Sequence, residues 1–234
     1  MEERLESLDI IINGIEEYLN LAETGLKLFK MTETFSMDGA SNLESVRIAL
    51  LNMRKLLSVL EIMVSKDTAL LGGEQYCNLA DFLRGIILEI KRISPSVADK
   101  IEFRDETFES MYRFNAQKMQ ILVYNITRIF IFGTMGQKIK LKLRLYETDK
   151  DFLMEFKGDA VLAEAPADLD RCMYYVLDKI TESMNFKYKF TTQKSATKCT
   201  IIIPKQEDVT AIAREDTGKT EIDTKYAEIF FSDL

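Results

Sequence analysis

The sequence of 234 residues contains no histidine and no tryptophan, and only three prolines, three cysteines and ten glycines. The missing histidine matters most, because imidazole is the only side chain whose unperturbed pKa lies between pH 5 and 8. Its absence removes the usual phosphoacceptor, general base and zinc ligand together. The sequence therefore excludes more chemistry than it indicates.

The cysteines Cys77, Cys172 and Cys199 are odd in number and far apart. This arrangement fits neither a disulfide framework nor a clustered zinc site. We expect three reduced, mostly buried thiols, since free cysteine is among the most buried residue types. No metal-ligating residue is predicted.

Long apolar runs are also missing. The longest apolar stretch, residues 121–132, is interrupted by polar side chains and falls short of the roughly 20 apolar residues that span a bilayer. The opening Met-Glu-Glu-Arg is not followed by an apolar signal-peptide core. We expect a cytoplasmic protein that does not contact a membrane.

Positive charge is scarce, with 31 basic residues against 38 acidic ones and a net charge of -7. Such a chain repels phosphate backbones unless its basic residues gather locally, and no basic patch is visible in the sequence. Nucleic-acid binding is therefore not expected. The 47% of hydrophobic residues is enough for at least one sizeable core.

Two segments near the N-terminus repeat apolar residues in alternating steps of three and four, which is the seam of a heptad. The first set is Leu5, Leu8, Ile12, Ile15, Leu19, Ala22, Leu26 and Phe29, and the second is Val46, Ala49, Met53, Leu56, Leu60 and Met63, with Leu57 and Val64 at its margin. A turn at residues 37–40 and a capping box of Ser41 and Glu44 separate them. This pattern predicts an antiparallel helical hairpin.

A lone hairpin would leave part of this apolar surface in water. Two hairpins that pair into a four-helix bundle would bury it, at about 1.5–3 kcal/mol per large side chain. We expect a homodimer through the hairpin. The alternative is that the hairpin packs against the rest of its own chain.

Leu71-Gly72-Gly73 breaks the helical pattern. After it, helices are expected at residues 79–93, 119–130 and 169–184, with Asn78 as the cap of the first, and strands at 100–103, 110–113, 138–146, 151–157, 186–192 and 198–204. Helices on one face of a mixed sheet make an α+β sandwich. The predicted domains are a helical hairpin at 1–71, this sandwich at 72–204, and a flexible tail at 205–234.

The tail is acidic, with four basic and eight acidic residues. Its end, residues 226–234, is more apolar. We expect this end either to dock on this or another protein or to fold back over an apolar face.

The order of elements over residues 5–204 resembles the dimerisation hairpin and ATPase domain of two-component histidine kinases. In that family the first long helix of the ATPase domain carries N-x-x-x-N, whose amides help to hold the magnesium of Mg-ATP. Here Asn125 matches one amide position and Ile129 occupies the other. The resemblance therefore implies a degenerate ATPase-like domain.

The family's D-x-G-x-G turn, whose carboxylate binds adenine, falls at residues 154–161, where the second glycine is missing. Lys157 or Gly158 stands at the carboxylate position, and Asp159 is either a displaced remnant or a simple turn residue. The glycine-rich lid is missing too, since residues 168–172 contain no glycine and carry acidic groups. No cofactor and no cofactor-binding residue are predicted.

One branch of the family, the histidine phosphotransferases, keeps both domains without nucleotide and passes phosphate between receiver domains. Residues 11–19, IINGIEEYL, are similar to the I-N-N-G-L-E-L-L element of that branch. There the phosphoacceptor precedes this element by three turns, or about 11 residues, a position at or before Met1. No catalytic residue is predicted.

The resemblance implies a pseudokinase: a catalytically silent, dimeric binding module of two-component signalling that docks a response-regulator receiver domain on the hairpin. The acidic residues expected on the docking face are Glu6, Asp9, Glu16, Glu17 and Glu23. Two alternatives stay open. One is a genuine phosphotransfer enzyme with a non-histidine acceptor such as Asp9, or with a longer natural N-terminus; the other is a purely structural coiled-coil scaffold.

Overall fold

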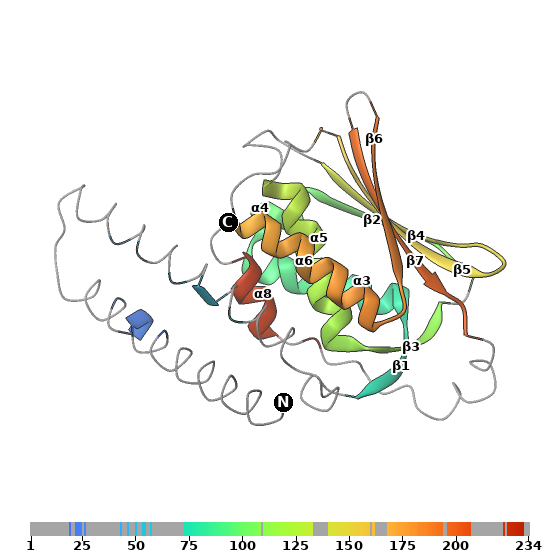
Figure 1. Cartoon of the computed structure of the whole chain (residues 1–234), viewed down its shortest axis with the longest axis horizontal. Helices are drawn as coiled ribbons and strands as arrows, with labels where there is room; N and C mark the ends of the chain where they lie inside the picture. Colours follow the sequence, from blue (N-terminus) through green and yellow to red (C-terminus); the bar gives the residue numbers. More distant parts are fainter. Residues whose placement is uncertain are drawn as a thin grey trace. The chain divides into compact units, whose positions relative to one another are not determined.

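The structure is a computed structural model that describes residues 19, 22–24, 26, 43, 46, 50, 53–54, 57, 73–108, 110–132, 140–159, 161, 168–193, 196–206, 222 and 224–231. The chain has two compact units, Met1–Lys66 and Asp67–Ser232. Most of the described residues belong to the second unit (Figure 1). The predicted turn at 37–40 and the capping box at Ser41 lie outside the described residues, and the predicted domain boundaries stay predictions.

A five-stranded mixed sheet forms one layer of the second unit, and helices cover one of its faces (Figure 1). The strands are β2 (Ile101–Glu106), β4 (Leu141–Glu147), β5 (Asp151–Gly158), β6 (Lys187–Gln193) and β7 (Ala196–Pro204). Their order is β2-β4-β5-β7-β6. The pair β2 and β4 is parallel, and the other neighbours are antiparallel. The predicted α+β architecture of this part of the chain is confirmed.

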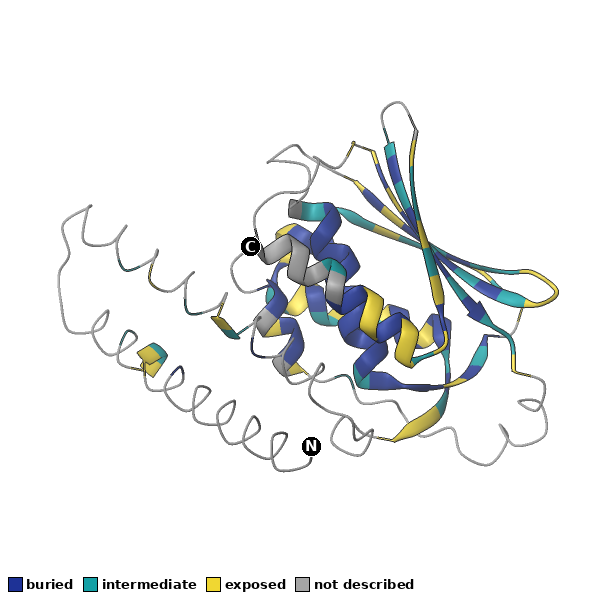
Figure 2. Cartoon of the chain, in the orientation of Figure 1, coloured by how far each residue is buried: buried dark blue, intermediate teal, exposed yellow. Residues whose placement is uncertain are grey.

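Alternating side chains give the sheet two different faces, because successive residues of a strand point to opposite sides. In β5 the buried residues Phe152, Met154 and Phe156 alternate with more accessible ones, and β7 follows the same rule with Cys199 and Ile201 (Figure 2). The buried set faces the helices. This packing creates the core of the unit.

Three long helices of the described chain form the second layer: α3 (Leu79–Ile93), α5 (Ala116–Phe132) and α6 (Asp168–Ser183). A short helix, α4 (Pro95–Ala98), follows α3. Helix α5 contacts β4, β5 and α6, which explains why even its polar residues Asn125, Thr127 and Arg128 are buried. Within the described ranges, none of the helices combines the length and the apolar character that a membrane crossing needs.

A second, two-stranded sheet consists of β1 (Glu74–Asn78) and β3 (Met111–Asn115), which pair antiparallel. The sequence predicts a strand close to β3 but places it in the same sheet as the others, and this placement is wrong. It also misses β1, since the segment EQYCN has no clear apolar alternation. Its strand conformation depends on hydrogen bonds to β3.

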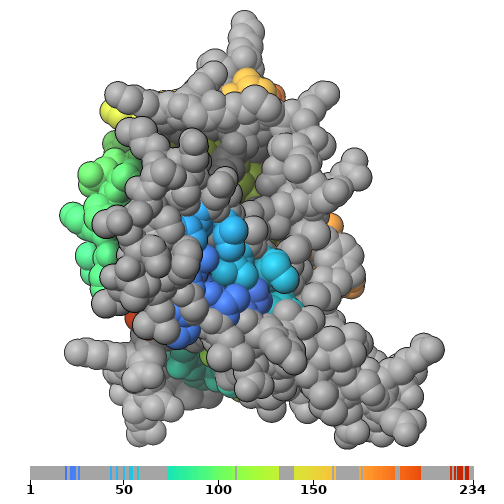
Figure 3. Space-filling model, turned by 90° about the vertical axis from the view of Figure 1, so that its left-hand side faces the viewer, coloured from blue at the N-terminus to red at the C-terminus, as the bar shows by residue number. Residues whose placement is uncertain are grey.

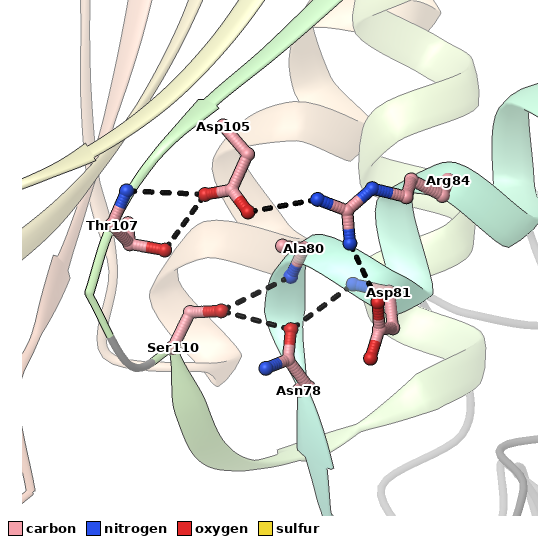
Figure 4. Close-up of polar contacts among 7 residues, drawn as sticks. All are labelled: Asn78, Ala80, Asp81, Arg84, Asp105, Thr107 and Ser110. Carbon is pink, nitrogen blue, oxygen red and sulfur yellow. Dashed lines mark hydrogen bonds and ion pairs between the residues drawn. The ribbon is translucent and has the colours of Figure 1, made fainter.

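Polar contacts at the start of α3 join β1 to the connection between β2 and β3 (Figure 4). Asn78 caps α3 as predicted, and its Oδ1 accepts from the Asp81 backbone at 3.1 Å and from the Ser110 hydroxyl at 2.9 Å. The Arg84 guanidinium pairs with Asp81 at 2.6 Å and with Asp105 at 2.9 Å. These contacts tie the first turn of α3 to the end of β2.

Residues 224–231 of the predicted flexible tail form a packed helix, α8 (Thr224–Phe231), which contacts α3 and α5. Its buried residues are Tyr226, Ala227, Phe230 and Phe231. The ring of Phe231 meets the ring of Tyr124 edge to face at 5.1 Å, and the Arg128 guanidinium donates to the Phe230 carbonyl. Residues 224–231 therefore fold back over the apolar faces of α3 and α5, which is one of the two possibilities that the sequence leaves open for the end of the chain.

Candidate functional site

The counterpart of the nucleotide site implied by the resemblance begins on α5. Asn125 is 1% exposed, and Ile129, four residues later on the same side of the helix, is 5% exposed. Ile129 is an apolar core residue at the position where the family has its second amide. Only one of the two magnesium-holding amides is therefore present.

The turn after β5 has a structural role. Gly158 pairs with Leu141 of β4 and with Thr197 of β7. The next residue, Asp159, accepts a hydrogen bond from the Lys140 backbone N–H through Oδ1 at 3.1 Å. Its carboxylate holds the start of β4 beside the end of β5. This contact favours the interpretation of Asp159 as a turn residue over that of an adenine-binding remnant.

The lid positions 160 and 162–167 and the side chains of residues 168–173, Cys172 included, fall outside the described residues. In the ranges that the structure describes, no three Cys, Asp or Glu side chains come together in a group that could hold a metal. Cys77 and Cys199 are buried, reduced thiols as predicted, and burial raises the pKa of the Cys199 thiol far above its ordinary value. Among the described residues, Ile129 and Asp159 do not offer Mg-ATP the groups that the kinase family uses at these positions.

The described residues of the first unit are helical and come from two stretches, one around Leu19 and one around Leu57; Figure 3 shows them in contact. Leu19 and Leu57 are buried and Leu50 packs against them, while Glu23 pairs with Arg54 at 2.9 Å. The contacts move forward along one stretch as they move backward along the other. Antiparallel helices have this order.

At described residues the predicted seam is divided between two faces, and one expectation about the hairpin is wrong. Val46 and Met53 belong to the predicted seam, yet each is 47% exposed, whereas Leu57 from the predicted margin is 4% exposed. Glu23 is expected on an outer acidic face, yet it faces Arg54 and its side chain is 19% exposed. The second stretch thus carries two apolar stripes, of which one packs within the chain and one is accessible. Glu6, Asp9, Glu16 and Glu17 lie outside the described residues.

The outer face of the five-stranded sheet collects basic side chains that the sequence does not group. Strand pairing puts seven basic and four acidic residues on this face: Arg104, Lys142, Arg144, Lys157, Lys187, Lys189 and Lys198, with Glu102, Glu106, Asp151 and Glu155. Lys142, Lys157 and Lys198 are direct neighbours across three strands. The expectation that the chain has no basic patch is therefore wrong. The residues alternate with buried ones and come from separate strands, so no basic run is visible in the sequence.

The sequence matches no family model and no curated protein. Solved structures of histidine kinases share the fold. Histidine kinase AdeS of Acinetobacter baumannii superposes with a TM-score of 0.55 at 10% identity, covering 86% of this chain and 96% of that chain. Full-length ShkA in complex with AMPPNP superposes with a TM-score of 0.58 at 13% sequence identity, covering 85% of this chain and 45% of that chain. Histidine kinase ThkA in complex with the response regulator protein TrrA superposes with a TM-score of 0.52 at 14% sequence identity, covering 88% of this chain and 64% of that chain.

These comparisons define the class of fold. The second unit, with its mixed five-stranded sheet under α3, α5 and α6, has the fold of a histidine kinase ATPase domain. At 10–14% identity this likeness extends to the fold alone.

Proposed function

We propose that this chain is a catalytically inactive, histidine-kinase-like binding module of two-component signalling. It forms a homodimer through its N-terminal helical hairpin and docks a response-regulator receiver domain there. The observation that carries the proposal is a kinase-type fold whose nucleotide site lacks its working residues, in a chain without histidine. Such a protein keeps the surfaces for association and loses the chemistry.

The inactive state rests on Ile129 and Asp159. Ile129 supplies no ligand for magnesium, and the Asp159 carboxylate is engaged with the Lys140 backbone. We expect no saturable micromolar binding of Mg-ATP to the full chain in calorimetry, and no transfer of label from ATP or from a phosphorylated receiver domain. An active histidine kinase is the positive control. Micromolar affinity for Mg-ATP, or a labelled chain, refutes the proposal.

The homodimer rests on the accessible apolar stripe of the first unit. Val46 and Met53 are one heptad apart and each is 47% exposed, so a second hairpin that covers them removes apolar surface from water. Sedimentation at micromolar concentration is expected to give twice the 27.0 kDa of the chain. Met53→Glu is expected to give the monomer, because it places a charge in the interface. A wild-type chain that sediments as a monomer contradicts the proposal.

Thr24→Glu is the matched control for the dimer. Thr24 is exposed and lies about 140° around its helix from the buried Leu19, at about 100° per residue. A new charge there is expected to leave the dimer intact. Dissociation by both variants would mean that added charge alone separates the chains.

Receiver docking follows from the same hairpin, and ThkA is a histidine kinase solved in complex with a response regulator. We expect the full chain to bind a purified receiver domain in biolayer interferometry. Reversal of charge at Glu16 and Glu17, the acidic residues expected on the outer face, is expected to weaken binding at least tenfold. Glu102→Lys on the sheet is the control and should leave affinity unchanged. If no receiver domain binds the intact chain, the proposed function fails.

A further inference from the structure

A cleft of about 220 Å³ opens in the second unit where α5 begins and α6 ends. Its walls include Tyr112, Phe114, Lys118, Ser183, Phe186 and Gln206. Helix α6 extends for about 22 Å, from Asp168 to Ser183. The cleft is therefore a helix length away from the first turn of α6, before which the kinase family places its nucleotide lid.

Lys118 is a costly residue at this place. It is the third residue of α5 and only 9% exposed, and its ammonium group has no hydrogen bond or ion pair with the described residues. Its backbone N–H donates to the Asn115 side chain at 2.9 Å, so Asn115 caps the helix. Most of the side chain is removed from water, so the charge has little solvent around it outside the cleft that it lines, and a cation opposes the positive end of the helix dipole. The first turn of α5 contains no acidic residue that could offset either effect.

The other charged groups of the cleft compensate each other. Arg113 pairs with Glu74, the acidic residue in the described wall, at 3.3 Å. One positive charge, that of Lys118, is left over. A negative group beside Lys118 would neutralise this charge and also meet the N-terminus of α5, where anions are favoured.

The rest of the wall selects for a small, partly apolar molecule. Phe114 and Phe186 are buried aromatic residues. The Gln206 amide exchanges two hydrogen bonds of 3.1 Å with the Arg113 backbone and so closes one side of the cleft. A volume of 220 Å³ corresponds to about seven water molecules at roughly 30 Å³ each, which suits a ligand the size of a substituted benzene.

We propose that this cleft binds a small organic anion. Its carboxylate or phosphate group pairs with the Lys118 ammonium at the start of α5, and its apolar part lies against Phe114 and Phe186. This binding goes beyond the proposed signalling role and is independent of the hairpin, of dimerisation and of any receiver domain.

Benzoate and phenyl phosphate test the two anionic head groups, and benzamide is the neutral control of the same shape. Binding to the full chain is measured by NMR titration of the probe. We expect at least one anion to bind at millimolar concentration and benzamide to bind at least tenfold more weakly. Lys118→Met is expected to weaken the anion at least tenfold, while Lys118→Arg keeps it within a few-fold. Lys91→Met, which removes an exposed lysine from α3, is expected to change nothing.

A measurement on the wild-type chain removes any dependence on the folding of a variant. Acylation of amines followed by mass spectrometry reports the accessibility of each lysine. The bound anion is expected to slow acylation of Lys118 and to leave Lys91 unaffected. The proposal is overturned if neither anion binds better than benzamide, if Lys118→Met binds as the wild type does, or if the anion does not protect Lys118. Because no partner protein is present, failure here is distinguishable from failure of receiver docking.

Discussion

Replacing Phe231 by alanine tests whether α8 belongs to the core of the second unit. The Phe231 side chain is fully buried, at 0% exposure, and its ring meets Tyr124 edge to face at 5.1 Å. Truncation of a core phenylalanine costs about 3–5 kcal/mol, because the transfer free energy of the ring is lost and a cavity remains. At roughly 2–4 °C per kcal/mol for a domain of this size, the Tm is expected to fall by about 6–20 °C.

The assay is urea unfolding followed by circular dichroism, together with hydrogen exchange of the α8 amides. Glu228→Ala on the same helix is the matched control, since its side chain is 61% exposed and lies 3.9 Å from Arg92; a change below about 0.5 kcal/mol is expected. A double-mutant cycle with Tyr124→Ala isolates the ring pair, for which about 0.5–1.5 kcal/mol is expected. An unchanged midpoint for Phe231→Ala, or α8 amides that exchange like a free peptide, would refute the packing argument.

Three further changes test other contacts. Gly85→Ala is expected to stabilise the chain by less than the about 1 kcal/mol by which alanine is favoured over glycine in helices, because its Cβ would lie 2.4 Å from Ile222 Cδ1 and this side-chain end must move. Thermal denaturation should show a larger gain in an Ile222→Ala background, and the same gain in both backgrounds would exclude the contact. Asn78→Ala is expected to lower the unfolding free energy by about 1–2 kcal/mol through loss of the α3 cap, whereas Asn78→Asp keeps the acceptor oxygen. If urea titrations show the same loss of unfolding free energy for both variants, the capping role is contradicted. The hydrogen bond from Lys205 at 2.8 Å lowers the pKa of Glu147 below its ordinary 4.5. The stability that this pair contributes is therefore present above pH 4.5 and is lost as the pH falls through the lower pKa of the folded state. Glu147→Gln should flatten the plot of unfolding free energy against pH in this range, and a plot parallel to that of the wild type would count against the pair.

Local chemistry made much of the second unit predictable. The apolar periods of α3, α5 and α6 and the alternation in β4 and β5 are visible in the sequence because each reports which side of one element is buried. Asn78 is predictable as a cap for the same reason, since the Asp81 backbone N–H that donates to it is only three residues away in the sequence. Strand β1 was missed because it is stabilised by β3, which follows 33 residues later, Asn78 pairing with Met111.

The candidate sites divide in the same way. Ile129 and the turn at Gly158 could be recognised from the sequence, because a missing motif is a property of adjacent residues. Lys118 could not, since a lysine near an apolar helix is ordinarily exposed, and the sequence does not show that this one is buried beside a cleft that Phe114, Phe186 and the end of α6 also line. The outer-face lysines could not either, because β-sheet pairing alone makes Lys142 a neighbour of Lys157.

The sequence by itself determined what this chain lacks: histidine, the second amide at Ile129 and the glycines of a nucleotide lid. It also determined the order of most helices and strands, β1 and α8 excepted, because period and capping act over a few residues. Tertiary structure alone decided which apolar stripe of the hairpin is accessible, where α8 packs and which lysine is buried. These outcomes depend on contacts between distant residues, such as the bond from Arg128 to Phe230 across 102 positions, and no local pattern encodes a contact over that distance.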